Sequence, residues 1–584
     1  MKLVFDIETD GLESTVVHCL VAQEVDTGQV WAYGPDAIED GVKLLNAAEQ
    51  LAGHNIIGFD IPVLEQLTSF KLGDQTIIDT LVLSRLFNPV REGGHSLAVW
   101  GTKLGLDKID FEDYEFFSQE MLDYCKRDVA VNVKVYKALQ KEGMGFSKES
   151  MDLEKEVAKI LKQQETHGFY FDLYKANMLL ALMREKMTET DREVSKVFKP
   201  EIGERTIYRR ETKTGSVAKT GTWDSPNGDH GVRLTDEEYA YLSNPTNYKV
   251  CRETRVDFNI GSRKQVGEYL LKFGWQPKEF TVNGRPIVNE KTLSQITDIP
   301  QAELIKDFLM YQKRGAQIDS WIKAAKEDSR VHGFVIPNGT ITGRMTHRDP
   351  NMAQVPSLSS PYGAECRRCW TVPDGFKLVG IDASGLELRM LAHYMNDKDY
   401  TNEIINGDIH TTNQGLAGLE SRTQAKTFIY ALLYGAGDEK LGTVSGGGRE
   451  VGARLRQSFF DNLPSFTNLK NQVSRAAARG YLKGLDGRKL FVRSEHSALN
   501  TLLQGAGAIV MKKALVIFND YIKDMDAHFV CNVHDEWQVE ADGQLADKVG
   551  ALGVKAIVEA GKHFNLNCPL DGEYNVGDNW AETH

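Results

Sequence analysis

The periods of the hydrophobic and polar positions divide the chain into regions of different expected structure. Over residues 1–145, short apolar runs such as KLVFDIE and VHCLVAQEV alternate with helical patterns such as AIEDGVKLLNAAEQL. Strands that alternate with amphipathic helices indicate an α/β domain with a sheet. Residues 150–198 are helical apart from the strand-like FYFD, residues 262–326 are helical, residues 331–400 carry strands and turns, and residues 410–520 are mostly helical.

Residues 200–260 differ from the regions on either side. They are rich in Gly, Thr, Asn, Pro and charged residues, and they have almost no periodic apolar face. We therefore expect a loop-rich or mobile segment here. It is either an insertion that docks a partner or an irregular excursion without one.

Length and composition indicate a multidomain protein without a membrane span. The 584 residues exceed what one hydrophobic core supports. No apolar run approaches the roughly 20 residues of a membrane helix, and the N-terminal MKLVFDIETD lacks the features of an export signal. Seven scattered cysteines indicate reduced thiols and a cytoplasmic location. One close pair, Cys366 and Cys369, has metal-ligand spacing without a second pair nearby, so incidental thiols are favoured over zinc.

The net charge of −13 argues against a polyanionic partner only as an average over the chain. Basic clusters recur, for example at Arg344 with Arg348 and at Arg488 with Lys489. Carboxylates concentrated in metal sites would leave the sum acidic even in a protein that binds nucleic acid.

Four carboxylates and a tyrosine from separate N-terminal segments could form one site. Asp6 and Glu8 are two apart on an expected strand and share a face, Asp60 ends HNIIGFD, and Tyr124 and Asp128 are four apart on an expected helix. An oxygen-only ligand set suits two Mg²⁺ or Mn²⁺ ions, which can activate water against a phosphodiester. Tyr124 could orient that water. The alternative is that these acids cap and solvate a plain α/β domain.

A second set of acids lies far along the chain. In CNVHDEWQVE, residues 531–540, Asp535 and Glu536 are adjacent, so either a tight turn intervenes or only one of them acts directly. Buried carboxylates need a cation, a metal ion or a proton. The apolar strand that ends at Asp382, in KLVGIDASGLELRML, offers a partner carboxylate for a shared pair of metal ions. Glu536 is then a secondary carboxylate.

Between these acids lies RTQAKTFIYALLYG, which has helical spacing. Arg422, Lys426 and Tyr430 fall at i, i+4 and i+8 on roughly one face, about 12 Å long at 1.5 Å per residue. Two cations followed by an aromatic ring suit a triphosphate that leads to a sugar and base. A salt-bridged surface helix is the alternative for this segment taken alone.

Two ordered sets of motifs resemble known families. DIET, NxxGFD and YxxxD resemble the three motifs of the proofreading 3′–5′ exonuclease fold. DASGLELR, RxxxKxxxYxxxYG and VHDE resemble motifs A, B and C of family A, the DNA polymerase I-like DNA polymerases. The match is closest to the replicative enzymes of short-tailed bacteriophages, and it extends through TGRMTHRDPNMAQVP, GDIHTTNQ and LDGRKLFVRSEHSALNTLLQ to nearly the whole chain outside residues 200–260.

The resemblance implies an α/β multidomain fold, in which a ribonuclease H-like exonuclease domain precedes a right-hand polymerase. The implied boundaries are residues 1–148 for the exonuclease domain, 149–335 for the thumb with its possible insertion, 336–410 and 485–584 for the palm, and 411–484 for the fingers. The implied activity is templated DNA synthesis with 3′–5′ proofreading. Nothing precedes the exonuclease motifs, so a 5′-nuclease domain is not expected.

The resemblance also assigns roles by position. Asp382 and Asp535 would bind two Mg²⁺ ions, as would the exonuclease carboxylates. Residues implied to hold the nucleotide are Arg422, Lys426 and His410 on the phosphates, with Lys426 also donating a proton to pyrophosphate, Tyr430 on the sugar and base, and Glu387 against a ribose 2′-hydroxyl. Residues implied to contact DNA are Tyr434 and Gly435 at the templating base, Arg344, Asn500 and Gln504 in the minor groove, and His534 at the primer terminus.

Partners follow from the same resemblance. Primer-template DNA and dNTPs are the implied ligands, and a Tyr at position 430 suggests tolerance of dideoxynucleotides. A thioredoxin-like processivity factor could dock on residues 200–260, and a replicative helicase-primase is a further candidate. Two rival functions remain: a repair nuclease whose polymerase half is vestigial, and a DNA-binding scaffold without catalysis.

Overall fold

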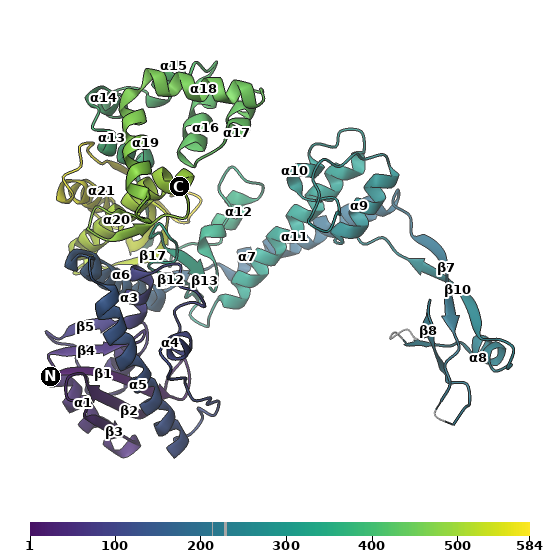
Figure 1. Cartoon of the computed structure of the whole chain (residues 1–584), viewed down its shortest axis with the longest axis horizontal. Coiled ribbons are helices and arrows are strands. Elements are labelled where there is room, and N and C mark those ends of the chain that lie inside the picture. Colours follow the sequence, from purple (N-terminus) through teal and green to yellow (C-terminus); the bar gives the residue numbers. More distant parts are fainter. Residues whose placement is uncertain (213, 227–230) are drawn as a thin grey trace. The chain divides into compact units, whose positions relative to one another are not determined.

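A computed structural model describes residues 1–212, 214–226 and 231–584. The chain forms two compact units (Figure 1). Unit 1 contains residues 1–173 and 323–584, and unit 2 contains residues 174–322. Each unit has its own hydrophobic core.

Unit 1 begins with a five-stranded mixed sheet in the order β3-β2-β1-β4-β5. Strand β1 (Lys2–Thr9) pairs antiparallel with β2 (Val17–Glu24) and parallel with β4 (Gln50–Gly53). Helix α5 (Gln119–Glu142) crosses one face of this sheet (Figure 1). Alternate residues of β1 enter two cores: Leu3 and Phe5 pack away from α5, whereas Val4 packs with α5. Asp6 and Glu8 share the parity of Val4, so the strand period aims them toward α5.

The expected strands and helices of this domain are confirmed. The other elements are β3 (Val30–Tyr33), β5 (Thr76–Asp79), α1 (Ile38–Asn46), α2 (Asp60–Leu67), α3 (Thr80–Phe87) and α4 (Leu97–Lys103), with the short helix η1 (Pro35–Ala37). Helix α6 (Lys148–His167) then leads into the second half of unit 1, where it packs on α20 (Ala498–Ile522).

A four-stranded antiparallel sheet, in the order β17-β18-β14-β19, forms the centre of the second half of unit 1. Its strands are β14 (Phe376–Ala383), β17 (Ala527–Val533), β18 (Glu536–Asp542) and β19 (Gly572–Gly577). Helix α21 (Ala546–His563) packs against β14, β19 and α20. By length and composition, residues 495–522, which include α20, could cross a membrane, but most of this segment is buried in the protein, as in the core helix of a folded domain.

Helices dominate the segment between β14 and β17, as the sequence predicts. They are α13 (Leu386–Met395), α14 (Lys398–Asn406), α15 (Ile409–Ala417), α16 (Arg422–Leu433), α17 (Asp438–Thr443), α18 (Arg449–Asn462) and α19 (Pro464–Ala477). Smaller elements of unit 1 are β6 (Phe169–Tyr170), β11 (Arg330–Val331), β12 (Phe334–Ile336), β13 (Thr346–Arg348), η2 (Met352–Gln354), α12 (Gly363–Arg367), β15 (Tyr481–Lys483), β16 (Lys489–Phe491) and η3 (Glu495–Ser497).

Four buried charges connect α6, the β15–β16 hairpin and α20. Glu154 Oε1 lies 2.5 Å from both Arg488 Nη1 and Lys512 Nζ, and Arg488 Nη2 lies 2.6 Å from Asp486 Oδ2. All four side chains are almost wholly buried. A buried charge is tolerated when it is paired and hydrogen-bonded, and loss of one partner would leave the others uncompensated. This network therefore fixes α20, which carries Asn500 and Gln504.

Unit 2 is built on two long helices and corrects one expectation. Helices α7 (Leu173–Ser195) and α11 (Pro300–Ala324) pack together where Gly315 of α11 approaches Leu180 and Met183, and α9 (Arg263–Lys272) and α10 (Glu290–Leu293) complete the core. The expectation of a loop-rich segment at residues 200–260 is wrong for the described part of it. Residues 213 and 227–230 lie outside the described residues.

That segment forms a four-stranded sheet in the order β10-β7-β8-β9, with one helix. The elements are β7 (Glu201–Tyr208), β8 (Thr220–Trp223), β9 (Gly231–Arg233), α8 (Asp236–Leu242) and β10 (Lys249–Val256). Its buried core consists of Ile207, Leu234 and Leu242. Strand β7 is mostly exposed on both faces, and the partly buried face of β10 carries Val250, Arg252 and Thr254, so neither strand shows the apolar alternation that identifies a strand in the sequence.

Candidate active sites

The first site lies between β1 and α5, where three potential ligand side chains meet. The ligand atoms of Asp6, Glu8 and Cys125 all lie within 4.8 Å of one another. Asp6 and Glu8 come from β1, and Cys125 comes from the facing turn of α5. The prediction that two carboxylates two residues apart share one face therefore holds in the structure.

Asp60 and Asp128 belong to the same electrostatic cluster. Asp60, the first residue of α2, accepts a hydrogen bond from the Ile7 backbone N–H at 3.2 Å. Asp128 Oδ2 lies 2.5 Å from Lys108 Nζ. Asp128 Oδ1 is buried and has no hydrogen-bond partner among the described residues. A buried carboxylate oxygen without a partner is costly unless a cation satisfies it.

The pKa values of these four acids are raised. Burial is the largest cause for each, and for Asp6 and Glu8 the neighbouring carboxylates Asp60 and Asp128 add to it. The pKa of Glu8 rises from 4.5 to about 9, and that of Asp60 from 3.8 to about 7. A divalent cation would stabilise the ionised form of these clustered acids. Their oxygen ligands suit Mg²⁺ or Mn²⁺.

Tyr124 and a lysine that the sequence analysis missed complete this site. Lys108 Nζ donates to the Tyr124 hydroxyl at 2.8 Å and also lies 4.8 Å from the ring centroid. Phe111 packs on Tyr124 at 5.5 Å and on Tyr114 at 5.1 Å. Lys108 lies in an irregular segment outside the motifs, so no periodicity pointed to it. Its cation lowers the pKa of Asp128 against the effect of burial.

The raised pKa values predict a pH-dependent stability in the metal-free chain. Between pH 4.5 and about 9, Glu8 is protonated in the folded chain but ionised in the unfolded chain. Unfolding therefore releases a proton, and stability falls as the pH rises through this window. Mg²⁺ should oppose this loss because it binds the folded carboxylates. Thermal unfolding across this range with and without Mg²⁺ tests the prediction, and a wild-type profile equal to that of a chain carrying Asp6→Ala and Glu8→Ala would contradict it.

The second site lies at one end of the sheet β17-β18-β14-β19. Asp535 occupies the two-residue turn between β17 and β18, after His534, which has a φ of 57°. A tight turn, one of the two expected alternatives, therefore lies at this point of the chain. The Ala383 backbone N–H donates to the Asp535 carbonyl at 3.1 Å, which brings the turn beside Asp382 at the end of β14. Burial, followed by Asp535 and Glu536, raises the pKa of Asp382 to about 7.

Glu536 pairs with Asp382 in the strand register but is already occupied by protein donors. Its Oε1 accepts from Trp580 Nε1 at 2.7 Å and from Gln538 Nε2 at 2.6 Å, and its Oε2 lies 2.8 Å from His584 Nδ1. These donors keep its pKa below the usual value despite burial. Glu536 therefore has less capacity left for a metal ion than Asp382 or Asp535.

Helix α16 places Arg422, Lys426 and Tyr430 as their spacing predicts. Arg422 Nε lies 2.7 Å from Asp408 Oδ2 at the exposed start of the helix. The ring centroid of His410, on α15, lies 6.3 Å from that of Tyr430. Burial and the cations Arg422 and Lys426 lower the pKa of His410. The face combines positive charge with an aromatic ring, which suits an anionic ligand that carries a base.

Glu387 links α13 to the end of α16. The Tyr434 hydroxyl donates to Glu387 Oε1 at 2.8 Å, and Arg344 Nη2 lies 3.3 Å from the same oxygen. Gly435, the next residue, has a φ of 77°, a conformation that glycine adopts without strain. Glu387 thus holds Tyr434, which the resemblance assigns to the templating base, and Arg344, which it assigns to the minor groove.

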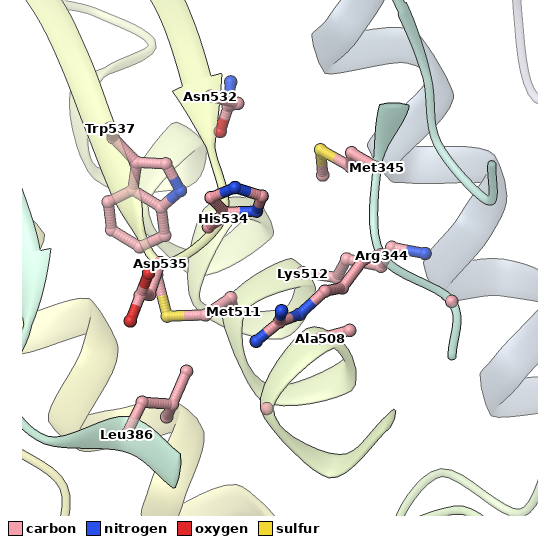
Figure 2. A pocket seen from close by; sticks show the side chains of 12 residues that line it. Arg344, Met345, Leu386, Ala508, Met511, Lys512, Asn532, His534, Asp535 and Trp537 are labelled. Carbon is pink, nitrogen blue, oxygen red and sulfur yellow. The ribbon is translucent and has the colours of Figure 1, made fainter. Parts of the chain in front are cut away.

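The residues assigned to the minor groove line one cleft. Arg344, Asn500, Gln504 and His534 all border a cleft of about 610 Å³. Asn500 and Gln504 lie one turn apart on α20. Figure 2 shows a neighbouring pocket, in which Arg344, His534 and Asp535 surround the space and Leu386 and Met511 add apolar wall. The structure therefore connects the minor-groove set to the turn that carries Asp535.

The CRRC pair does not join either site. Cys366 and Cys369 are both buried, and the Cys369 thiol donates to the Glu365 carbonyl at 3.4 Å. Among the described residues, the group of Asp6, Glu8 and Cys125 is the one that brings three such side chains within ligand distance. The expectation of incidental thiols stays a prediction.

Known proteins resemble this chain over its whole length. A model of the family described as DNA polymerase family A matches residues 235–582. The DNA-directed DNA polymerases of Enterobacteria phage T3 and Escherichia phage T7 are each 32% identical to the chain, and each alignment covers 100% of both proteins. The DNA-directed DNA polymerase of Escherichia phage Phieco32 is 36% identical over 43% of this chain and 46% of its own length.

A solved structure shares the fold. The POL domain of Pol1 from M. smegmatis, in complex with DNA primer-template and dNTP, superposes with a TM-score of 0.77 at 17% identity, covering 100% of this chain and 95% of that chain. The expected fold class is confirmed: a ribonuclease H-like exonuclease domain precedes a right-hand polymerase domain. The chain belongs to DNA polymerase family A and is a DNA-directed DNA polymerase related to those of bacteriophages.

Proposed function

We propose that this polymerase is a replicative, phage-encoded enzyme that extends a primer with dNTPs and removes errors with its own 3′–5′ exonuclease. The observation that carries the proposal is the presence of two separate carboxylate sites in unit 1. One lies between β1 and α5, and the other lies at the β17–β18 turn. The positions of the acids on the two sheets, and the raised pKa values of Glu8 and Asp382, support phosphoryl transfer at both sites. A host bacterial cytoplasm suits the free thiols, among them Cys19 and Cys125.

In the polymerase site, Asp382 and Asp535 would hold two Mg²⁺ ions, which when bound activate the primer 3′-hydroxyl and neutralise the triphosphate. Arg422, Lys426 and His410 bind the phosphates through charge and hydrogen bonds. Lys426 donates a proton to the departing pyrophosphate. The protein contributes mainly position and electrostatics, as phosphoryl transfer requires.

Recognition of the nucleotide and the duplex uses the neighbouring side chains. Tyr430 packs on the incoming sugar and base, and Tyr434 with Gly435 lies at the templating base. Arg344, Asn500 and Gln504 contact minor-groove acceptors, which occupy similar positions in every correct pair. His534 contacts the primer terminus. The shared cleft of the minor-groove residues and His534 supports this assignment.

In the exonuclease site, Asp6, Glu8, Asp60 and Asp128 would hold two Mg²⁺ ions, or Mn²⁺ in their place, which supply a hydroxide and stabilise the departing oxygen. Tyr124 orients the attacking water through its hydroxyl, which Lys108 holds at 2.8 Å. The unpartnered Asp128 Oδ1 supports a cation at this place.

Unit 2 offers a surface for an accessory protein. Ile202, Tyr241, Tyr248 and Val256 are exposed on the sheet and helix of residues 201–256. We propose a thioredoxin-like processivity factor for this surface. Extension length per binding event, measured with and without thioredoxin and with these residues replaced by Ser, tests it. A replicative helicase-primase as a further partner stays a prediction.

A 5′-labelled primer on a longer template tests both activities of the purified chain. With Mg²⁺ and four dNTPs the primer should lengthen, and without dNTPs it should shorten. Shortening alone would favour a repair nuclease with a vestigial polymerase half. A primer unchanged in both lanes would contradict both proposed activities for the chain acting alone.

Replacement of Glu387 by Ala is expected to relax sugar selection. The carboxylate fills space beside Tyr434, and its loss opens room for a ribose 2′-hydroxyl. Incorporation of rNTPs relative to dNTPs should rise by about tenfold or more, the size of discrimination that one filled group provides. Glu387→Gln keeps the bulk and should retain selection. An unchanged ratio in Glu387→Ala would contradict the assignment.

A further inference from the structure

We propose that Asp408 is a positioning residue of the polymerase site, which holds Arg422 while no nucleotide is bound and takes it back from pyrophosphate after each incorporation. The Asp408 carboxylate thus competes with the phosphates for one arginine. The inference rests on the proposed function, in which Arg422 binds the phosphates of the nucleotide. Asp408 belongs to the motif GDIHTTNQ, in which the proposed function assigns a role only to His410.

The start of helix α15 fixes the Asp408 carboxylate. Asp408 is the N-cap residue of α15, and its Oδ1 accepts a hydrogen bond from the His410 backbone N–H at 3.1 Å. Its Oδ2 accepts from the Thr411 hydroxyl at 2.8 Å and from Arg422 Nε at 2.7 Å. Because two of these donors belong to α15 itself, Asp408 keeps its place when Arg422 leaves.

Arg422 is the movable partner of this ion pair. It is the first residue of α16, and the exposed fractions of the two side chains are 57% for Arg422 and 42% for Asp408. An exposed ion pair contributes little to stability, so a ligand with several negative charges replaces the carboxylate at small cost. The arginine fork binds a phosphate group as it binds a carboxylate. The pair therefore places Arg422 beside the site and still releases it to a polyphosphate.

The position of Arg422 on α16 indicates which part of the nucleotide it meets. Tyr430 follows eight residues later, about 12 Å along the helix at 1.5 Å per residue. With Tyr430 on the sugar and base, Arg422 lies at the phosphates farthest from the base. These phosphates leave as pyrophosphate once the α-phosphate has joined the primer. Asp408 lies where it can receive Arg422 as the pyrophosphate departs.

The same carboxylate acts on a second phosphate-binding side chain. Burial, Arg422 and Lys426 lower the pKa of His410, and the charge of Asp408 opposes them. Lys426, one turn further along α16, makes no ion pair within the part of the chain that the structure describes. Asp408 therefore offsets part of the positive charge that the phosphates meet, and it does so at the end where pyrophosphate leaves.

Single-turnover incorporation by the full chain with Mg²⁺ tests the proposal. Rates over a range of dNTP concentrations give the dNTP dissociation constant and the maximal rate, and added pyrophosphate gives its inhibition constant. In Asp408→Asn both constants are expected to fall by about two- to fivefold, the range for an exposed ion pair, with the maximal rate within about twofold of wild type. A residue with only a structural role would weaken binding when replaced, so a gain in affinity is specific to competition.

Helix α15 should survive the substitution, because Asn is as good an N-cap residue as Asp. Thermal unfolding checks this, and Asp408→Ser, which also keeps a capping oxygen, replaces Asp408→Asn if the latter does not fold. Glu420→Gln is the control matched in charge. Glu420 is exposed, two residues before Arg422, and makes no ion pair with it among the described residues. Its replacement should change both constants by less than about 1.5-fold, since salt screens such a charge.

A double-mutant cycle with Arg422→Gln completes the test. In that background Asp408→Asn should change neither constant by more than Glu420→Gln does, because the arginine for which it competes is gone. Unchanged or weaker binding in Asp408→Asn, or a gain that persists without Arg422, would overturn the inference while the proposed function stands. If Arg422→Gln alone leaves the dNTP dissociation constant unchanged, the phosphate role of Arg422 fails, and the inference fails with it.

Discussion

Asp382→Ala or Asp535→Ala is expected to abolish primer extension and to leave 3′-end digestion intact. Each substitution removes one of two carboxylates that the β17–β18 turn and the end of β14 bring together. Loss of a ligand to the catalytic ions removes several kcal/mol of transition-state stabilisation, so extension should fall by at least about 1,000-fold. Single-turnover incorporation with Mg²⁺ measures it, and primer shortening in parallel reactions without dNTPs provides the second readout.

Glu573→Ala is the matched control for this prediction. Glu573 lies opposite Asp382 on the neighbouring strand β19, and it is exposed and outside the proposed ligand set. Its removal should leave extension within about twofold, because surface substitutions have small effects. Loss of digestion together with extension in Asp382→Ala would contradict two independent sites. Extension that survives in both Asp variants would place the metal ions elsewhere.

The positions of both acid sets could be predicted because each acid lies at a fixed place in a local pattern. Asp6 and Glu8 share a strand face, and Asp382 lies at the end of an apolar strand. The hydrophobic period and the element type are therefore enough to predict where these acids lie. The choice between a turn and a continuous strand at residues 531–540 could not be made. His534 adopts a positive φ, which is uncommon for residues other than glycine, so the turn could not be predicted from the sequence.

Features that depend on contacts between distant segments were beyond the sequence. Lys108 reaches Asp128 and Tyr124 from an irregular segment, and Cys125 faces Asp6 from helix α5. Neither contact leaves a periodic signal. The sheet at residues 201–256 was missed for another reason: β7 is mostly exposed on both faces, and the partly buried face of β10 carries Val250, Arg252 and Thr254, so neither strand shows an apolar alternation.

The buried acids of unit 1 differ in how the protein compensates them. Arg, Lys, His and Trp donors already hold Glu536 and Glu154, so these acids belong to fixed networks. Asp6 and Glu8 have raised pKa values. An acid that stays protonated for lack of compensation is the one that a metal ion changes most. This contrast separates candidate metal ligands from structural acids within unit 1.

The combined substitution Asp6→Ala and Glu8→Ala is expected to abolish primer shortening and to leave extension intact. Both side chains aim from β1 toward α5 and Asp128, so their loss removes the centre of the proposed ligand set. Digestion should fall by at least about 1,000-fold, on the same grounds as for the polymerase acids. Release of labelled nucleotide from a single-stranded 3′ end measures it, and misincorporation over a long template should rise because errors are no longer removed.

Asp123→Ala is the matched control, since Asp123 lies on the same helix α5 but pairs with Lys126 at the surface. It should digest and extend like wild type. The double variant should also be more stable than wild type in metal-free buffer at neutral pH, because it removes the acid whose burial, together with the neighbouring carboxylates, raises the Glu8 pKa to about 9. Loss of digestion together with a gain in metal-free stability would show that Asp6 and Glu8 serve metal binding and not folding. Loss of both digestion and stability would instead assign them a structural role in the sheet.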